Sequence, residues 1–95
     1  DSFCPIGGIA TDFGDLASLT VVTRVNGEEK QRGSVSEMVF SIPMLLSYVS
    51  HVMTLEPGDV VATGTPGGVA PLCDGDVVEV EILGLSKVSN PVRHA

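Results

Sequence analysis

The chain has 95 residues, of which 43% are hydrophobic and 18% charged, and its formal net charge at pH 7 is −7. This length suits one small domain, and the apolar fraction is too high for a disordered chain. No apolar run approaches the roughly 18 residues that a membrane span needs, and the acidic balance argues against a nucleic-acid partner.

The first part of the chain predicts extended structure and one hairpin. Gly8–Thr11 is expected as a short strand, and the polar, Gly-containing run Asp12–Ser18 as a loop. The β-branched run Leu19–Val25 and the polar run Glu28–Arg32 are joined by Asn26-Gly27, the pair that favours a type I′ turn. Because the second strand is almost wholly charged or amide, this hairpin is expected at a solvated sheet edge.

One helix follows the hairpin. Ser34–Glu37 has the form of a capping box and predicts a single helical turn. Ser41 is expected to cap a longer helix, with Pro43 in its first turn. An apolar stripe at helical spacing predicts that this helix packs on a core. The stripe consists of Ile42, Leu45, Leu46, Val49, Val52 and Met53.

The last part predicts turns that lead into strands. Gly58-Asp59-Val60-Val61 recurs as Gly75-Asp76-Val77-Val78, which indicates that the same turn is used twice. The expected segments are, in order, a turn at Glu56–Gly58, a strand at Asp59–Thr63, a Gly-rich loop at Thr63–Gly68, a turn at Cys73–Gly75 and strands at Asp76–Leu83 and Leu85–Val92. The predicted class is α+β, mainly β, with one packing helix.

The cysteines and histidines give no pattern typical of a metal or disulfide framework. Cys4 and Cys73 have no ligand spacing, which favours buried thiols in a reducing compartment, with one bridge between them as the second interpretation. His51 is expected at the surface or a boundary, and His94 lies in the C-terminal tail. The start at Asp1, with no signal or targeting pattern, indicates a processed chain or an excerpt, and predicts the cytoplasm, or mitochondria in a eukaryote.

Two features are candidate binding sites. The loop Thr63–Gly68 presents backbone N–H groups and two hydroxyls beside glycines, which suits an anion such as a carboxylate, although a tight turn explains the same residues. It lacks the Lys of a phosphate-binding P-loop. Glu79 and Glu81 share a strand face and have the spacing to hold a divalent cation, but a solvated strand face is the more common origin of this pattern. No Ser-His-Asp triad is assembled by the sequence.

The order of several motifs closely resembles the C-terminal portion of the fumarylacetoacetate hydrolase family, over nearly the whole chain. This family includes acylpyruvases, oxaloacetate decarboxylases and isomerase/decarboxylases of aromatic catabolism. The motifs are Phe3-Cys4-Pro5-Ile6-Gly7, Val25-Asn26-Gly27-Glu28, Met38-Val39-Phe40-Ser41-Ile42-Pro43, the long segment from Thr54-Leu55-Glu56-Pro57-Gly58-Asp59 to Thr63-Gly64-Thr65-Pro66-Gly67-Gly68, then Gly75–Ile82 and Asn90-Pro91-Val92.

The resemblance implies a fold of the mixed β-sandwich or β-roll type and an Mg²⁺- or Mn²⁺-dependent enzyme. Such enzymes hydrolyse, decarboxylate or isomerise 2-oxo acids or 1,3-dicarbonyl compounds by Lewis-acid chemistry. It implies that Thr65, with its neighbour Gly64, binds the carboxylate or carbonyl end of the substrate. Glu79 and Glu81 do not map onto the family's metal ligands and are kept as a strand face.

The resemblance also implies that the family's metal ligands and its general acid or base precede Asp1. Residues 1–95 are therefore expected to be one C-terminal segment that binds no metal itself and contains no catalytic residue. Its expected partners are the N-terminal portion of the same enzyme, a small 2-oxo acid and a second copy in a homodimer. The alternative is a non-catalytic β-rich module for oligomerisation or ligand binding.

Overall fold

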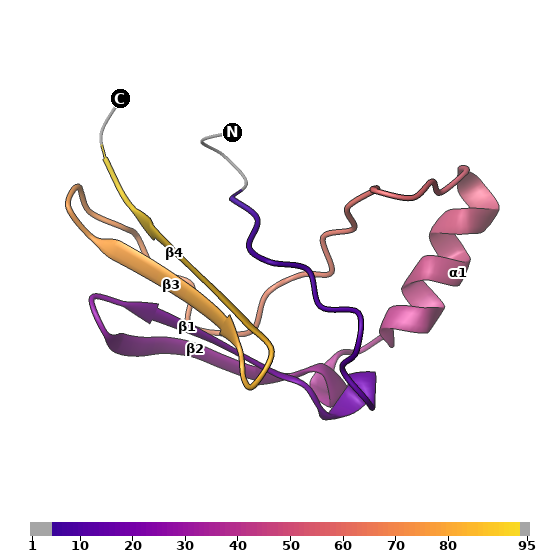
Figure 1. Cartoon of the computed structure of the whole chain (residues 1–95), viewed down its shortest axis with the longest axis horizontal. Coiled ribbons are helices and arrows are strands. Elements are labelled where there is room, and N and C mark those ends of the chain that lie inside the picture. Colours follow the sequence, from indigo (N-terminus) through magenta and orange to yellow (C-terminus); the bar gives the residue numbers. More distant parts are fainter. Residues whose placement is uncertain (1–4, 94–95) are drawn as a thin grey trace.

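The computed structural model describes residues 5–93, in which a four-stranded antiparallel sheet carries one α-helix (Figure 1). The strands lie in the order β2-β1-β3-β4. This confirms the α+β, mainly β class. The elements are η1 (Leu16–Ser18), β1 (Thr20–Val25), β2 (Glu28–Ser34), η2 (Val35–Glu37), α1 (Ile42–Val52), β3 (Val77–Ile82) and β4 (Ser86–Pro91), where η marks a 3₁₀ helix.

The β1–β2 hairpin forms as predicted and places β2 at the edge of the sheet. Asn26 and Gly27 adopt φ angles of 53° and 83°, the left-handed values that a type I′ turn requires. Asn26 also ties the turn to the neighbouring strand, because its Oδ1 accepts from the Val77 N–H at 2.9 Å. Its Nδ2 donates to Asp76 Oδ1 at 2.9 Å. The hairpin tip is thereby joined to the start of β3.

The recurring Gly-Asp motif forms the same turn twice, as the sequence predicts. In the first copy Asp59 Oδ2 accepts from the Glu56 N–H at 2.8 Å, and in the second Asp76 Oδ2 accepts from the Cys73 N–H at 2.9 Å. Gly58 and Gly75 have φ angles of 93° and 91°, which glycine adopts without strain. Each Asp therefore closes its own turn.

Asp76 is the carboxyl that closes the second turn, and we expect it to make that turn sensitive to acid. The Cys73 N–H and then the Asn26 amide donate to its carboxylate and hold the pKa of Asp76 below its usual range. A carboxyl whose pKa is lowered by folding stabilises the fold above its unfolded pKa, about 4, and loses that contribution as the pH falls through the folded value. We expect Asp76→Asn to flatten the fall in thermal unfolding temperature below about pH 4. Asp12→Asn, in the exposed N-terminal segment, is the charge-matched control. Equal pH profiles for Asp76→Asn and the native chain would contradict this role.

Two predicted strands are wrong. Gly8–Thr11 and Asp59–Thr63 belong to no strand and have no regular secondary structure. Gly8 lies beside β4, where its carbonyl accepts from the Ser86 hydroxyl at 3.4 Å, a side-chain contact and not a ladder bond. Val60, in the second segment, is 68% exposed. A β-type sequence becomes a strand only when a neighbouring backbone pairs with it, and none does so within residues 5–93.

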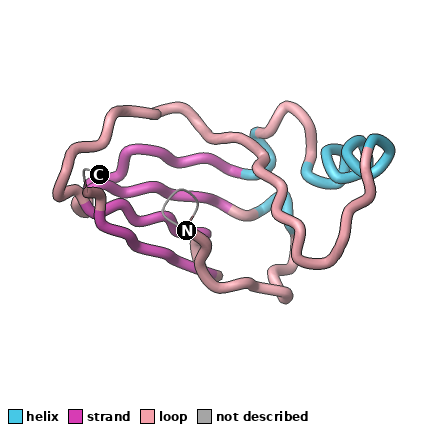
Figure 2. Tube along the Cα trace, turned by 90° about the horizontal axis from the view of Figure 1, so that it is seen from above, coloured by secondary structure: helices cyan, strands magenta, loops and turns pink. Residues whose placement is uncertain are grey.

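The helix α1 forms as predicted but lies beyond the end of the sheet and over neither face (Figures 1 and 2). Ser41 caps it, since its Oγ accepts from the Met44 N–H at 3.2 Å. Its apolar stripe stays at least partly exposed, with Val52 at 67%. No helix in the described part of the chain is long and apolar enough to cross a membrane.

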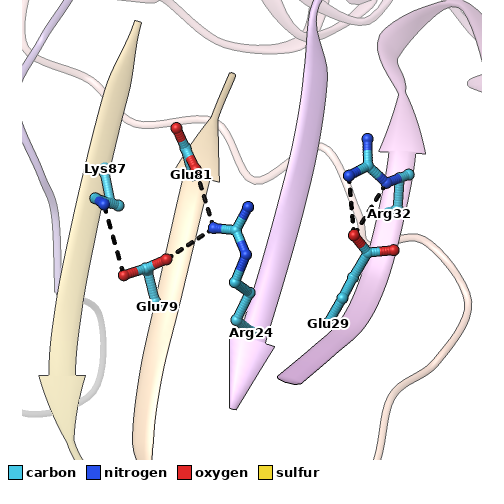
Figure 3. A network of polar contacts seen from close by, with 6 residues as sticks. All are labelled: Arg24, Glu29, Arg32, Glu79, Glu81 and Lys87. Carbon is cyan, nitrogen blue, oxygen red and sulfur yellow. Dashed lines mark hydrogen bonds and ion pairs between the residues drawn. The ribbon is translucent and has the colours of Figure 1, made fainter. Parts of the chain in front are cut away.

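The sheet has one charged and one apolar face. The charged face carries the six residues of Figure 3 and also Val22, which is fully buried between its cross-strand partners Arg32 and Glu81. The apolar face contains Val21, Thr23, Val25, Val78, Val80 and Ile82, by the register of β1 with β3. With a radius of gyration of 14.7 Å, the described chain is more extended than the roughly 12 Å expected at this length. Much of its apolar surface is therefore exposed.

Candidate ligand site

A cavity of about 660 Å³ lies between the apolar sheet face and the connection from α1 to β3. The sheet contributes Val21, Thr23, Val78 and Val80, and the connection contributes Thr65 and Pro66. Gly64 also lines this space. Thr65 and Gly64, the two residues expected to bind substrate, therefore line a cavity between the sheet and the Gly-rich loop. Their contact with a substrate stays a prediction.

The loop Thr63–Gly68 rests on β2, the strand that the sequence assigned only to a solvated edge. A Cβ atom on Gly33 would lie 2.9 Å from the Pro66 Cβ, and a Cβ on Gly68 would overlap the Lys30 carbonyl oxygen. Gly68 also has a φ of 102°, which side-chain-bearing residues rarely adopt. Both glycines are therefore required for close approach of the loop to β2.

A β-bulge shapes β2 where the loop meets it. Thr23 pairs with Gln31 whereas Arg24 pairs with Glu29, so Lys30 is an additional residue on β2. Bulges bend a strand and redirect its backbone groups. Here the Lys30 carbonyl oxygen is the atom nearest to the position that a Cβ on Gly68 would take. The irregularity thus lies at the contact between β2 and the loop.

Gln31 is a site residue that sequence reasoning missed. Its Nε2 lies 2.8 Å from Thr65 Oγ1 and 2.8 Å from the Pro66 carbonyl oxygen. Gln31 is only half-exposed, unlike its neighbours Lys30 and Arg32. Alternation could not have found it, because counting back from the Asn26-Gly27 turn pairs Thr23 with Lys30. Only the bulge brings Gln31 opposite Thr23, on the same side of the sheet as the apolar positions of β1.

Glu79 and Glu81 form ion pairs within the charged sheet face (Figure 3). Arg24 Nη1 lies 2.7 Å from Glu79 Oε1 and 2.9 Å from Glu81 Oε1, and Lys87 Nζ lies 3.8 Å from Glu79 Oε2. Hydrogen bonds to Glu81 and Glu79 raise the pKa of Arg24, which stays protonated. The interpretation of Glu79 and Glu81 as part of a strand face is confirmed.

The described residues do not fit the divalent metal ion that the family resemblance implies. Within residues 5–93, no group of three or more His, Cys, Asp or Glu side chains is placed to hold a metal ion. Glu79 and Glu81 share one arginine as their partner, and His51 Nδ1 lies 2.6 Å from the Ser47 carbonyl oxygen of its own helix.

Metal binding by the 95-residue chain can be measured directly. We expect no saturable heat when Mg²⁺ or Mn²⁺ is titrated into this chain by calorimetry, because a divalent ion needs several converging oxygen ligands. Circular dichroism of the same sample serves as the control that the chain is folded. A saturable isotherm with micromolar affinity would contradict this prediction.

The expectation of a buried thiol is wrong for Cys73, which is exposed. It begins the turn before β3, where its backbone N–H bonds to Asp76, and the turn holds its side chain at the surface. Cys4 lies outside the described residues, so the alternative of a bridge is untested. His94 also lies outside them.

Comparison with known proteins supplies the family. The profile described as "Fumarylacetoacetate (FAA) hydrolase C-terminal" matches residues 1–93. The chain belongs to the fumarylacetoacetate hydrolase family. A Pyrococcus horikoshii protein is 49% identical over 90 residues, which are 93% of this chain and 39% of that protein. The "4-hydroxyphenylacetate degradation bifunctional isomerase/decarboxylase" of Salmonella dublin is 44% identical over 95 residues, 97% of this chain and 22% of the enzyme.

A solved structure of this family has the same fold. It is the maleylpyruvate hydrolase of Sphingobium sp. SYK-6 in complex with manganese (II) ion and pyruvate, with a TM-score of 0.90 and 38% identity. The match covers 98% of this chain and 36% of that enzyme. The family thus includes hydrolase, isomerase and decarboxylase members. The chain spans less than half the length of the relatives described here.

Proposed function

We propose that residues 1–95 are the C-terminal, substrate-binding segment of a divalent-metal-dependent enzyme of the fumarylacetoacetate hydrolase family. The enzyme acts on C–C bonds of 2-oxo acids or 1,3-dicarbonyl compounds by hydrolysis, decarboxylation or isomerisation. The observation that carries the proposal is the loop Thr63–Gly68, which holds the Thr65 hydroxyl beside a cavity of about 660 Å³. The pyruvate in the similar maleylpyruvate hydrolase supports a 2-oxo acid as the substrate class.

In this proposal the chain binds and orients the substrate and supplies no catalytic residue. Thr65 donates a hydrogen bond to the substrate carboxylate. The backbone N–H groups around Gly64 donate further hydrogen bonds to the same anion. Mg²⁺ or Mn²⁺ would be held by residues outside this segment and would supply Lewis-acid polarisation of the substrate carbonyl. The manganese ion in the maleylpyruvate hydrolase supports use of such a metal.

Exposed apolar surface supports a further part of the same protein as a partner. Val39, Phe40 and Met44, in and before α1, are 92%, 57% and 56% exposed. A stable domain of this size needs to bury such residues to offset its conformational entropy. We propose that an N-terminal portion of the enzyme packs on this surface, and that the enzyme is a cytoplasmic homodimer.

The test is a substrate panel with the complete protein that contains this chain. We expect turnover of a compound such as oxaloacetate or maleylpyruvate, loss of activity with a chelator and recovery with Mn²⁺ or Mg²⁺. Analogues in which the carboxylate is an ester are the matched control, because they retain the carbonyl and lose the charge. Absence of turnover and of binding across the panel would favour the non-catalytic module instead. Equal turnover of acids and esters would exclude carboxylate recognition.

A further inference from the structure

The amide of Gln31 has only one orientation that satisfies both of its contacts. A carbonyl oxygen accepts hydrogen bonds and cannot donate them. The atom 2.8 Å from the Pro66 carbonyl oxygen must therefore be the amide nitrogen of Gln31. The same nitrogen lies 2.8 Å from Thr65 Oγ1, so its second hydrogen points to that hydroxyl.

This orientation fixes the role of the Thr65 hydroxyl. Since an amide NH₂ group only donates, Thr65 Oγ1 is the acceptor in its bond with Gln31. The hydroxyl keeps its own proton available for a different acceptor. Thr65 lines the cavity, so an anionic oxygen bound there is a suitable acceptor.

The Gln31–Thr65 hydrogen bond is one of several contacts between the loop Thr63–Gly68 and β2. Gly33 leaves room for the Pro66 ring, and Gly68 leaves room for the Lys30 carbonyl oxygen. With the two hydrogen bonds of Gln31, these close approaches make four contacts between β2 and the loop, each between residues more than 30 positions apart in sequence. A loop held at several points loses less conformational freedom when a ligand binds.

We propose that Gln31 is a positioning residue that fixes the Thr65 hydroxyl as a hydrogen-bond donor to the carboxylate of a 2-oxo acid. The inference rests on the proposed function for the identity of the ligand. The loop contact itself does not depend on that ligand. Gln31 also lines the cavity, and the role proposed for it is indirect, through its hydrogen bonds to Thr65 and Pro66.

The experiment compares Gln31→Met, Thr65→Val and the double variant in the complete protein. Methionine has nearly the length of glutamine but no amide donor. We expect Gln31→Met to raise KM about 5- to 10-fold, as for loss of a typical hydrogen bond, with kcat within about twofold. The double variant is expected to equal Thr65→Val alone, because both changes remove the same interaction. Arg32→Met, on the opposite sheet face, is the control for loss of a polar β2 side chain.

A second readout needs no substrate. The order parameter of the Thr65 methyl group, measured by NMR relaxation, is expected to fall in Gln31→Met, while that of Thr63 is unchanged. An unchanged Thr65 order parameter, or additive KM effects, overturns the inference. The native protein could turn over no 2-oxo acid while the Thr65 methyl order parameter still falls in Gln31→Met. In that case the proposed function fails and the positioning of the loop by Gln31 stands.

Discussion

Thr65→Val is expected to raise KM for a 2-oxo acid roughly 10- to 100-fold in the complete protein. A hydrogen bond to a charged group is worth about 1.5–3 kcal/mol, and each 1.4 kcal/mol corresponds to a factor of ten. Valine keeps the shape of threonine and removes only the hydroxyl. Because the carboxylate beside the 2-oxo group stays intact and keeps its charge through the reaction, the change is expected mainly in KM, as for a contact equally strong in the ground and transition states.

Thr63→Val is the matched control for this variant. Thr63 belongs to the same loop and is exposed, and the substitution removes the same atom. We expect a KM within about twofold of the native value, the range typical of a surface change. Steady-state kinetics with saturating Mn²⁺ measure both. Similar KM values for the two variants would show that the loop does not bind the carboxylate through Thr65.

Gly68→Ala is expected to displace the loop from β2. An alanine Cβ would overlap the Lys30 carbonyl oxygen, a backbone atom that cannot rotate away, and the φ of 102° is unfavourable for alanine. A residue other than glycine at such an angle costs on the order of 1–3 kcal/mol, before the overlap is counted. We therefore expect both a lower free energy of unfolding and a higher KM, measured by denaturant titration and by kinetics.

Gly67→Ala separates this close contact from a general sensitivity of the loop. No atom lies within 4 Å of a Cβ built on Gly67, and its φ is not in the left-handed region. The substitution is expected to change the free energy of unfolding by less than about 0.5 kcal/mol. A Gly67→Ala protein as impaired as Gly68→Ala would mean that the loop tolerates no change and that the contact with Lys30 is not the cause.

Local sequence predicted the elements whose hydrogen bonds are made by nearby residues. The Asn26-Gly27 turn, the Ser41 cap and the two Gly-Asp turns all formed, because each depends on contacts within a few positions. The resemblance to the family, carried mainly by the segment from Thr54 to Gly68, also held. The two wrong strands, in contrast, required a partner from elsewhere in the chain, and a β-type sequence does not specify one.

The sequence by itself determined the class of this protein, its family and the loop with the candidate hydroxyl Thr65. Only the tertiary structure placed that loop on β2 and assigned Gln31 as its support, across 34 positions of sequence. The physical reason is that a polar edge strand has the same sequence pattern whether its side chains meet water or another loop. Contacts between distant segments depend on register and on the β-bulge at Lys30, and the pairing of the folded chain decides both.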